Sequence, residues 1–187
     1  MKKILLTCIA MCFMLSINAQ NEDADQDEDT TTKDIFERKH EVRLGVLKLL
    51  GGGIFEGSYE YILDENQGFG VYALVNFDSS SDWFENYSLT PYYRMYFQTY
   101  EDYGAKGFFV EGFTSFFVGD YNLEDSLFGE DENEDVFDIA IGISLGKKWL
   151  NRAGFVFEAK LGVGRNLLGN SDSDVIVKGD LSIGYRF

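Results

Sequence analysis

The sequence is dominated by a repeated alternation of apolar and polar residues with a period of two, from residue 40 to residue 187. This period is typical of β-strands, because successive side chains point to opposite faces of a sheet. Eight such runs follow one another, and no run of helical period competes with them. The predicted strands are His40 to Leu49, Ile54 to Leu63, Gly68 to Phe77, Asn86 to Phe97, Gly107 to Val118, Val136 to Leu145, Gly154 to Asn166 and Val175 to Phe187.

Each predicted strand has one nearly apolar face and one polar face. The clearest case sets Ile139, Ile141 and Ile143 against polar or small residues. Only the run from 107 to 118 carries Phe on both faces, where Glu111 and Ser115 mark the polar one. The charged residues of the polar faces are Glu41, Arg43, Glu56, Glu60, Arg94, Glu111, Asp138, Glu158, Lys160, Lys178, Asp180 and Arg186.

Eight antiparallel strands of about ten residues fit two kinds of closed barrel. In a soluble, lipocalin-like binding barrel of the periplasm, the apolar face points inward. In a membrane barrel, the apolar face meets lipid and the charged face fills the lumen. Three features favour the membrane barrel: aromatic residues near the strand ends, mixed charges that can pair inside, and small residues on the polar face. Those small residues are Gly45, Gly70, Ala140, Gly142, Gly162, Gly164 and Gly184.

The connections between strands support the same interpretation, since membrane barrels have long external loops and short periplasmic turns. Asp78 to Glu85, Gly119 to Asp135 and Leu167 to Asp174 would face outward, whereas Asp64 to Gln67 and Lys147 to Ala153 would form short turns. The sequence thus predicts an all-β, eight-stranded, antiparallel, up-and-down transmembrane β-barrel.

The first residues have the pattern of an export signal. Lys2 and Lys3 precede an apolar stretch from Ile4 to Ile17, and Ala19 offers a small residue for cleavage. Residues 1–19 are therefore predicted as a signal peptide. Residues 20–38 are almost entirely polar and acidic and are predicted as a disordered tether, because they cannot bury enough apolar surface to fold. The barrel occupies residues 39–187.

Composition and charge exclude several functions. Both cysteines, Cys8 and Cys12, lie in the signal peptide, so the mature chain is predicted to have no disulfide, thiolate catalysis or Cys-ligated metal. The sequence has 16 basic and 32 acidic residues. Removing Lys2 and Lys3 leaves 14 against 32, a net charge of −18, which argues against nucleic-acid binding.

Two sets of residues suggest catalytic chemistry. His40 is the only histidine, and with a nearby Ser and Glu it would suit a lipid-modifying or hydrolytic barrel enzyme. Glu56, Glu60, Glu111 and Glu158 share the interior, where paired carboxylates can divide acid and base roles. The favoured interpretation is an interfacial His40 and glutamates that pair with interior cations. No catalytic, cofactor-binding or metal-binding residue is therefore assigned, and no cofactor is expected. The expected cations are Arg43, Arg94, Lys160 and Arg186.

The segment from Gly119 to Asp135 contains eight acidic residues and no basic one. Dense carboxylates can bind Ca²⁺, but the EF-hand spacing is absent, and a solvated external loop is favoured. Leu127 and Phe128 offer an apolar contact for an envelope or surface protein.

Several short motifs resemble an uncharacterised family of small outer-membrane β-barrels from Bacteroidota-type bacteria, catalogued as a domain of unknown function. They are Glu60-Tyr61, Arg94-Met95-Tyr96-Phe97, Gly107-Phe108-Phe109-Val110 and Gly184-Tyr185-Arg186-Phe187. The resemblance implies a fold and an outer-membrane location, but no catalytic residues.

The last strand also resembles the signal read by barrel-assembly machinery, with aromatic residues at Tyr185 and Phe187. The predicted function is a structural or surface-interaction role in the bacterial outer membrane. The expected partners are membrane lipid, the assembly machinery and an envelope protein.

Overall fold

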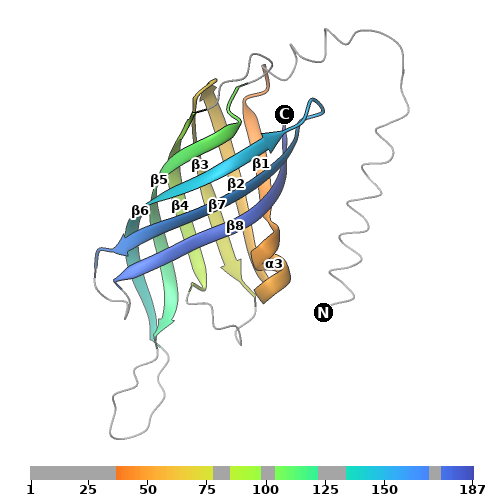
Figure 1. Ribbon diagram of the computed structural model, residues 1–187. Coiled ribbons are helices and arrows are strands. Elements are labelled where there is room, and N and C mark those ends of the chain that lie inside the picture. The colour runs from red at the N-terminus through yellow and green to blue at the C-terminus, as the bar shows by residue number, and fades with distance from the viewer. Residues whose placement is uncertain (1–36, 78–84, 98–103, 122–133, 169–173) are drawn as a thin grey trace, which may run out of the picture.

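The chain forms a closed antiparallel β-barrel of eight strands, each paired with the next in sequence and the last with the first (Figure 1). The computed structural model describes residues 37–77, 85–97, 104–121, 134–168 and 174–187. The predicted eight-stranded up-and-down architecture is confirmed. The strands are β1 (His40–Gly45), β2 (Ile54–Asp64), β3 (Gln67–Asn76), β4 (Tyr87–Tyr96), β5 (Gly107–Tyr121), β6 (Glu134–Leu150), β7 (Phe155–Asn166) and β8 (Val175–Arg186).

The barrel closes where β1 meets β8. The amide of His40 donates to the carbonyl oxygen of Phe187 at 3.1 Å, and the amide of Phe187 donates to the carbonyl oxygen of His40 at 2.8 Å. From there the ladder runs as far as Gly45 and Ser182. The first and last strands therefore seal the sheet, and the described sheet has no free edge at this end.

The alternation read from the sequence is the alternation between outside and inside. In β4, Tyr87, Leu89 and Tyr93 are exposed, while Thr90 and Arg94, which have the opposite parity, are buried. The ambiguous strand β5 follows the phase that its polar residues indicated. Inward-pointing Glu111 and Ser115 are joined in the lumen by Phe109, Phe113 and Phe117.

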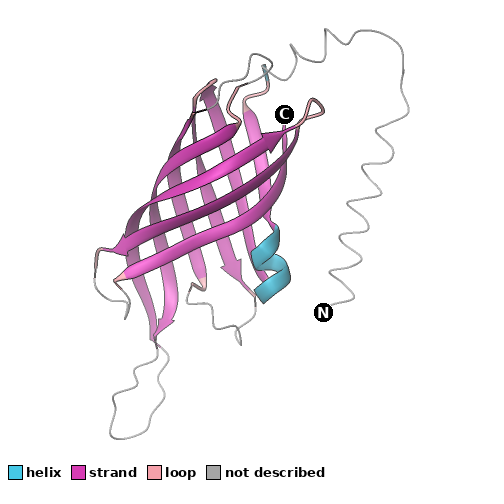
Figure 2. Cartoon of the chain, viewed as in Figure 1, coloured by secondary structure: helices cyan, strands magenta, loops and turns pink. Residues whose placement is uncertain are grey.

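The predicted strand from His40 to Leu49 is wrong beyond Gly45. Residues Val46–Gly52 form a short helix, α3. Leu and Lys are good helix formers, and the glycines that follow end the helix: Gly53 adopts φ 67°, a conformation that Gly tolerates without strain. Figure 2 shows this helix at the end of the barrel away from the C-terminus. Strand β1 is consequently only six residues long.

The predicted turn from Lys147 to Ala153 is also too long. Strand β6 continues to Leu150, and the turn is confined to the residues before Phe155. The alternation persists, with Lys148 buried and Trp149 exposed, but the consecutive lysines at 147 and 148 obscured it in the sequence. No helix among the described residues is both long and apolar enough to cross a membrane.

Candidate functional site

The centre of the lumen is organised around Arg94 of β4, whose side chain is fully buried. Its guanidinium nitrogens lie 2.6 Å from Glu111, 2.6 Å from Glu158 and 3.0 Å from Glu60, and these carboxylates come from β5, β7 and β2. It also donates to the hydroxyl of Tyr72 at 2.5 Å. A single planar cation thus ties together four other strands. Arg suits this position better than Lys, because its planar guanidinium directs several N–H donors toward different acceptors at once.

A second layer lies toward the end of the barrel that holds the C-terminus (Figure 1). Lys148 Nζ lies 2.8 Å from Glu41 and 2.9 Å from Glu60, and Arg43 Nη1 lies 2.6 Å from Glu60 and also contacts Glu41. Arg186 of the last strand lies 3.0 Å from Glu41 of the first. Each of these charges is buried and paired. Pairing is required here because a buried charge without a partner would cost a large desolvation free energy.

A separate ion-pair group occupies the α3 end. Lys48, on the buried side of α3, bonds Glu56 of β2, and Lys178 Nζ lies 2.7 Å from Glu85. Glu56 was predicted to share the interior with the other three glutamates. The structure places it on Lys48 instead, so only Glu60, Glu111 and Glu158 meet at Arg94.

Aromatic side chains fill the space between the charged layers. Tyr72 and Tyr92 stack with ring centroids 4.5 Å apart. Phe113 packs over Gly142 of β6 so closely that a Cβ at that glycine would overlap its ring, and Phe109 stands in the same relation to Gly146. Because Gly142 and Gly146 have no side chain, they leave room on the polar face for these phenylalanine rings. In the part of the chain that the structure describes, buried aromatic and charged side chains therefore fill the lumen.

At the end that holds the C-terminus, backbone segments as well as side chains close the barrel. The two terminal nitrogens of Arg186 donate to the carbonyl oxygens of Gly104 and Ala105 at 2.9 and 2.8 Å. The amide of Ala105 donates to the carbonyl oxygen of Glu65 at 2.6 Å, and its side chain has no exposed surface. Gly104 and Ala105, just before β5, therefore cap the lumen at this end.

The outer surface is the apolar one. Leu161 is 65% exposed and Ile143 is 60% exposed, although both lie in the middle of their strands. Aromatic side chains gather nearer the strand ends, where Trp149 and Phe157 lie with ring centroids 5.2 Å apart. Lys147 Nζ stands over the Trp149 ring, 5.3 Å from its centroid. An apolar band bounded by aromatic residues and a charged, filled interior together define the class of transmembrane β-barrels.

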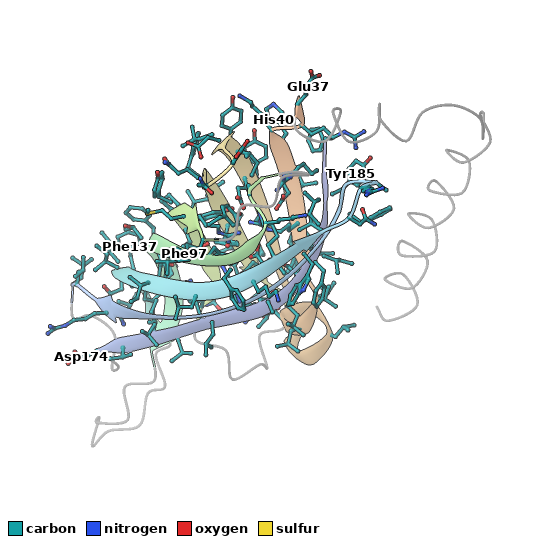
Figure 3. All side chains as sticks on the ribbon, turned by 45° about the horizontal axis from the view of Figure 1, so that its top comes forward. Glu37, His40, Phe97, Phe137, Asp174 and Tyr185 are labelled. Atoms are coloured by element: carbon teal, nitrogen blue, oxygen red, sulfur yellow. The ribbon has the colours of Figure 1, made fainter. Side chains whose placement is uncertain are left out.

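His40 lies on the outer surface, away from the interior glutamates. Its Nδ1 is 2.7 Å from the hydroxyl of Tyr59, and its ring stacks on Phe187 with centroids 5.8 Å apart. Figure 3 shows His40 and Tyr185 at the end that holds the C-terminus, and Asp174 at the opposite end. The structure therefore does not join His40 to a catalytic arrangement with the buried carboxylates.

One group of described carboxylates has the spacing of a cation site. Oxygens of Glu41, Glu60 and Glu158 lie within 4.8 Å of one another. Each of them is already bonded to a protein cation, with Arg43 contacting all three. The donor set is therefore neutralised by guanidinium and ammonium groups, and it suits an internal ion-pair network better than a metal ion.

Two further predictions are not tested by the structure, and the first falls partly outside the described residues. In the acidic segment from Gly119 to Asp135, the first three residues belong to β5 and the last two belong to β6. Its remainder, with Leu127 and Phe128, lies outside the described residues, so Ca²⁺ binding stays a prediction. Tyr185 and Phe187 are exposed at the end of the last strand, and their recognition by assembly machinery also stays a prediction.

Sequence reasoning missed three interior charges. All twelve predicted polar-face charges point into the barrel, but Lys48, Glu85 and Lys148 join them. Continuing the period of two past Leu145 would have found Lys148, because it has the same parity as Asp138. Lys48 had no such signal, since its inward direction depends on α3.

Comparisons with known proteins return one fold likeness. No family model matches the chain, and no curated protein matches it. Among solved structures, the chain is similar to the Yersinia pestis outer membrane protein Ail in phospholipid bilayer nanodiscs, with 20% identity and a TM-score of 0.41. The match covers 81% of this chain and all of that one.

Proposed function

We propose that the protein is a small β-barrel of the bacterial outer membrane with a structural or surface-interaction role. The observation that carries this proposal is the inverted polarity of the barrel. Large apolar side chains are exposed on the outside, and fifteen charged residues of the described chain line the inside. In water such a molecule would expose its apolar band. In a bilayer that band meets acyl chains, while the closed sheet satisfies its backbone internally.

The contents of the lumen support a structural role over transport. Eight strands enclose a space just wide enough for side chains. Here that space holds the Arg94 network, the stacked Tyr72 and Tyr92, and the Gly104–Ala105 cap. These buried and paired groups occupy the lumen around Arg94, which favours a filled barrel over an open pore. Interactions with other molecules are therefore assigned to the outer surface and to the connections at the two ends.

The orientation follows from export. If residues 1–19 direct the chain through the inner membrane, the start of β1 and the end of β8 lie on the periplasmic side. The end with α3 then faces outward, together with the connections after β3, β5 and β7.

Planar-bilayer recording tests the sealed lumen. The purified full chain, inserted in a phospholipid bilayer, is expected to show no discrete conductance steps, because ions would have to displace buried, paired charges. A sixteen-stranded porin recorded in the same bilayer provides the positive control, since its wide lumen conducts. Regular single-channel steps from this barrel would refute the structural role and favour a pore.

A further inference from the structure

Three cationic side chains surround the turn between β6 and β7, at the end of the barrel that holds the C-terminus (Figure 1). Arg152 is exposed within this turn, and Lys147 lies on the outward face of β6 just before it. Arg38, which precedes β1, reaches the same turn. Its Nη1 donates to the carbonyl oxygen of Ala153 at 3.5 Å and to the hydroxyl of Tyr185 at 3.3 Å. We call Arg38, Lys147 and Arg152 the basic rim.

The structure of the turn holds the basic rim in place. The amide of Gly154 donates to the carbonyl oxygen of Asn151 at 3.1 Å, and the amide of Phe155 donates to the side-chain oxygen of Asn151 at 2.8 Å. Gly154 adopts φ 97°, and a Cβ at this residue would lie 3.1 Å from Arg38 Nη1. Because Gly154 has no side chain, Arg38 can pack against the turn.

Lys147 lies at the edge of the apolar band. It is four residues from Ile143, which is midway between the outward aromatic residues Phe137 and Trp149 of β6. With a rise of about 3.3 Å per residue and a tilt of about 40°, Lys147 is about 10 Å from the middle of a band that is about 25 Å tall. Its Nζ lies 4.7 Å from the centroid of the Phe108 ring and 5.3 Å from that of Trp149. The side chain is therefore placed to extend along the aromatic rings toward the headgroups.

The basic rim has little acidic surface beside it. No ion pair among the described residues includes Lys147 or Arg152. The exposed acids at this end of the described chain are Glu37, Asp64 and Glu65. The last two lie at the turn between β2 and β3, four strands away around the barrel and therefore on its opposite side. Glu37 adjoins Arg38, so three cations and one acid leave a net charge of +2 at the rim.

Exposed aromatic rings line the wall on the membrane side of the basic rim. Trp149 and Phe157 lie with ring centroids 5.2 Å apart, and Phe155 meets Tyr185 edge to face at 5.5 Å. In membrane barrels such rings lie at the boundary between acyl chains and headgroups. A lipid whose acyl chains cover these rings would therefore have its phosphate at the level of the basic rim.

We propose that the basic rim binds the headgroup of an anionic phospholipid, such as phosphatidylglycerol, in the leaflet at the C-terminal end. The phosphate oxygens accept hydrogen bonds from Arg38 and Arg152, and Lys147 adds a third positive charge. A zwitterionic headgroup carries its own cation, which the three side chains repel. The inference rests on the proposed function, since the rim meets lipid only if the barrel spans a bilayer. In the proposed orientation this leaflet is the periplasmic one.

Trp149 provides a fluorescent reporter within the site. The full chain with Trp83→Phe keeps Trp149 as its only tryptophan. It is reconstituted in phosphatidylcholine vesicles that contain a small fraction of brominated phosphatidylglycerol or of brominated phosphatidylcholine, because bromine quenches nearby tryptophan fluorescence. From the quenching at equal fractions, we expect phosphatidylglycerol to be preferred at Trp149 by about fivefold or more, since one cation near an anionic headgroup contributes about fivefold.

Substitutions by Gln separate the basic rim from the rest of the wall. The triple variant Arg38→Gln, Lys147→Gln, Arg152→Gln should lose the preference, and each single change should lower it by about twofold to fivefold. The matched control Arg165→Gln should keep it, because Arg165 is exposed at the other end of β7.

The outcomes distinguish the lipid site from the membrane location. Equal quenching by the two lipids in the unaltered rim, or a preference that survives the triple substitution, would overturn the lipid site and leave the membrane barrel intact. A loss of preference in Arg165→Gln equal to that of the triple variant would overturn it as well. Absence of quenching by both lipids would overturn the membrane location itself.

Discussion

Replacing Arg94 with Met is expected to lower the free energy of unfolding by about 3–5 kcal/mol, the cost of removing one partner from a buried ion pair. The reason is the number of charges that depend on this residue. Glu60, Glu111 and Glu158 all contact its guanidinium and are at most 1% exposed. Met fills much of the same volume, so the loss reports uncompensated charge more than a cavity. Urea titration of the barrel in lipid vesicles, followed by tryptophan fluorescence, measures it.

Arg152 supplies the matched control. It lies exposed in the turn between β6 and β7, and Arg152→Met makes the same chemical change outside the network. Surface substitutions of this kind usually alter stability by less than about 0.5 kcal/mol. Equal losses for the two variants would show that the interior charges do not hold the barrel closed.

Replacing Ile143 with Arg is expected to destabilise the barrel by about 2–4 kcal/mol, the cost of a cation on the lipid face at the bilayer midplane. Ile143 is 60% exposed and lies six residues from Phe137 on one side and six from Trp149 on the other. These outward aromatic residues mark the two interfaces on β6, so Ile143 lies midway between them. On a water-soluble barrel the same substitution would be almost neutral. The measurement is again urea unfolding in lipid vesicles.

Val42→Arg makes a similar substitution at a different depth. Val42 is 45% exposed on the outer face of β1, and it lies opposite Tyr59 on β2 and Tyr185 on β8. At this interfacial level an arginine costs about 0–1 kcal/mol. A cost for Ile143→Arg no larger than that for Val42→Arg would mean that the apolar band does not cross a bilayer.

The barrel could be predicted from the sequence because alternation with a period of two identifies a strand and also assigns each residue to one of its two faces. Asp138 and Arg94 could be placed inside from parity alone, without knowledge of which strands would meet. The phase of β5 was harder, since Phe occurs at both parities and only Glu111 and Ser115 distinguish them. The inward phenylalanines became understandable once Gly142 and Gly146 on the neighbouring strand left room for their rings.

The errors have a common physical cause. Where a strand ends and which buried charges pair depend on strand register and tertiary contacts, which the local sequence pattern does not determine. The apolar face of the first run extended to Val46, and the strand was predicted to continue to Leu49. Helix formation in α3 instead allowed Lys48 to reach Glu56 across the missing part of β1. Likewise, pairing of Glu56 with the other glutamates required knowledge of its height in the barrel. Only the β2–β3 and β1–β2 registers place it near α3 and away from Arg94.

The most direct test of the central claim, that the apolar face spans a bilayer, is a depth profile along β6 by electron paramagnetic resonance. Nitroxide labels are attached to single cysteines at the outward positions Phe137, Ile139, Ile141, Ile143 and Leu145 in lipid vesicles. We expect collision with oxygen to rise, and collision with a water-soluble nickel chelate to fall, toward a maximum depth near Ile143. A flat profile, with nickel accessibility at Ile143 equal to that of a label at Arg152, would contradict the membrane barrel.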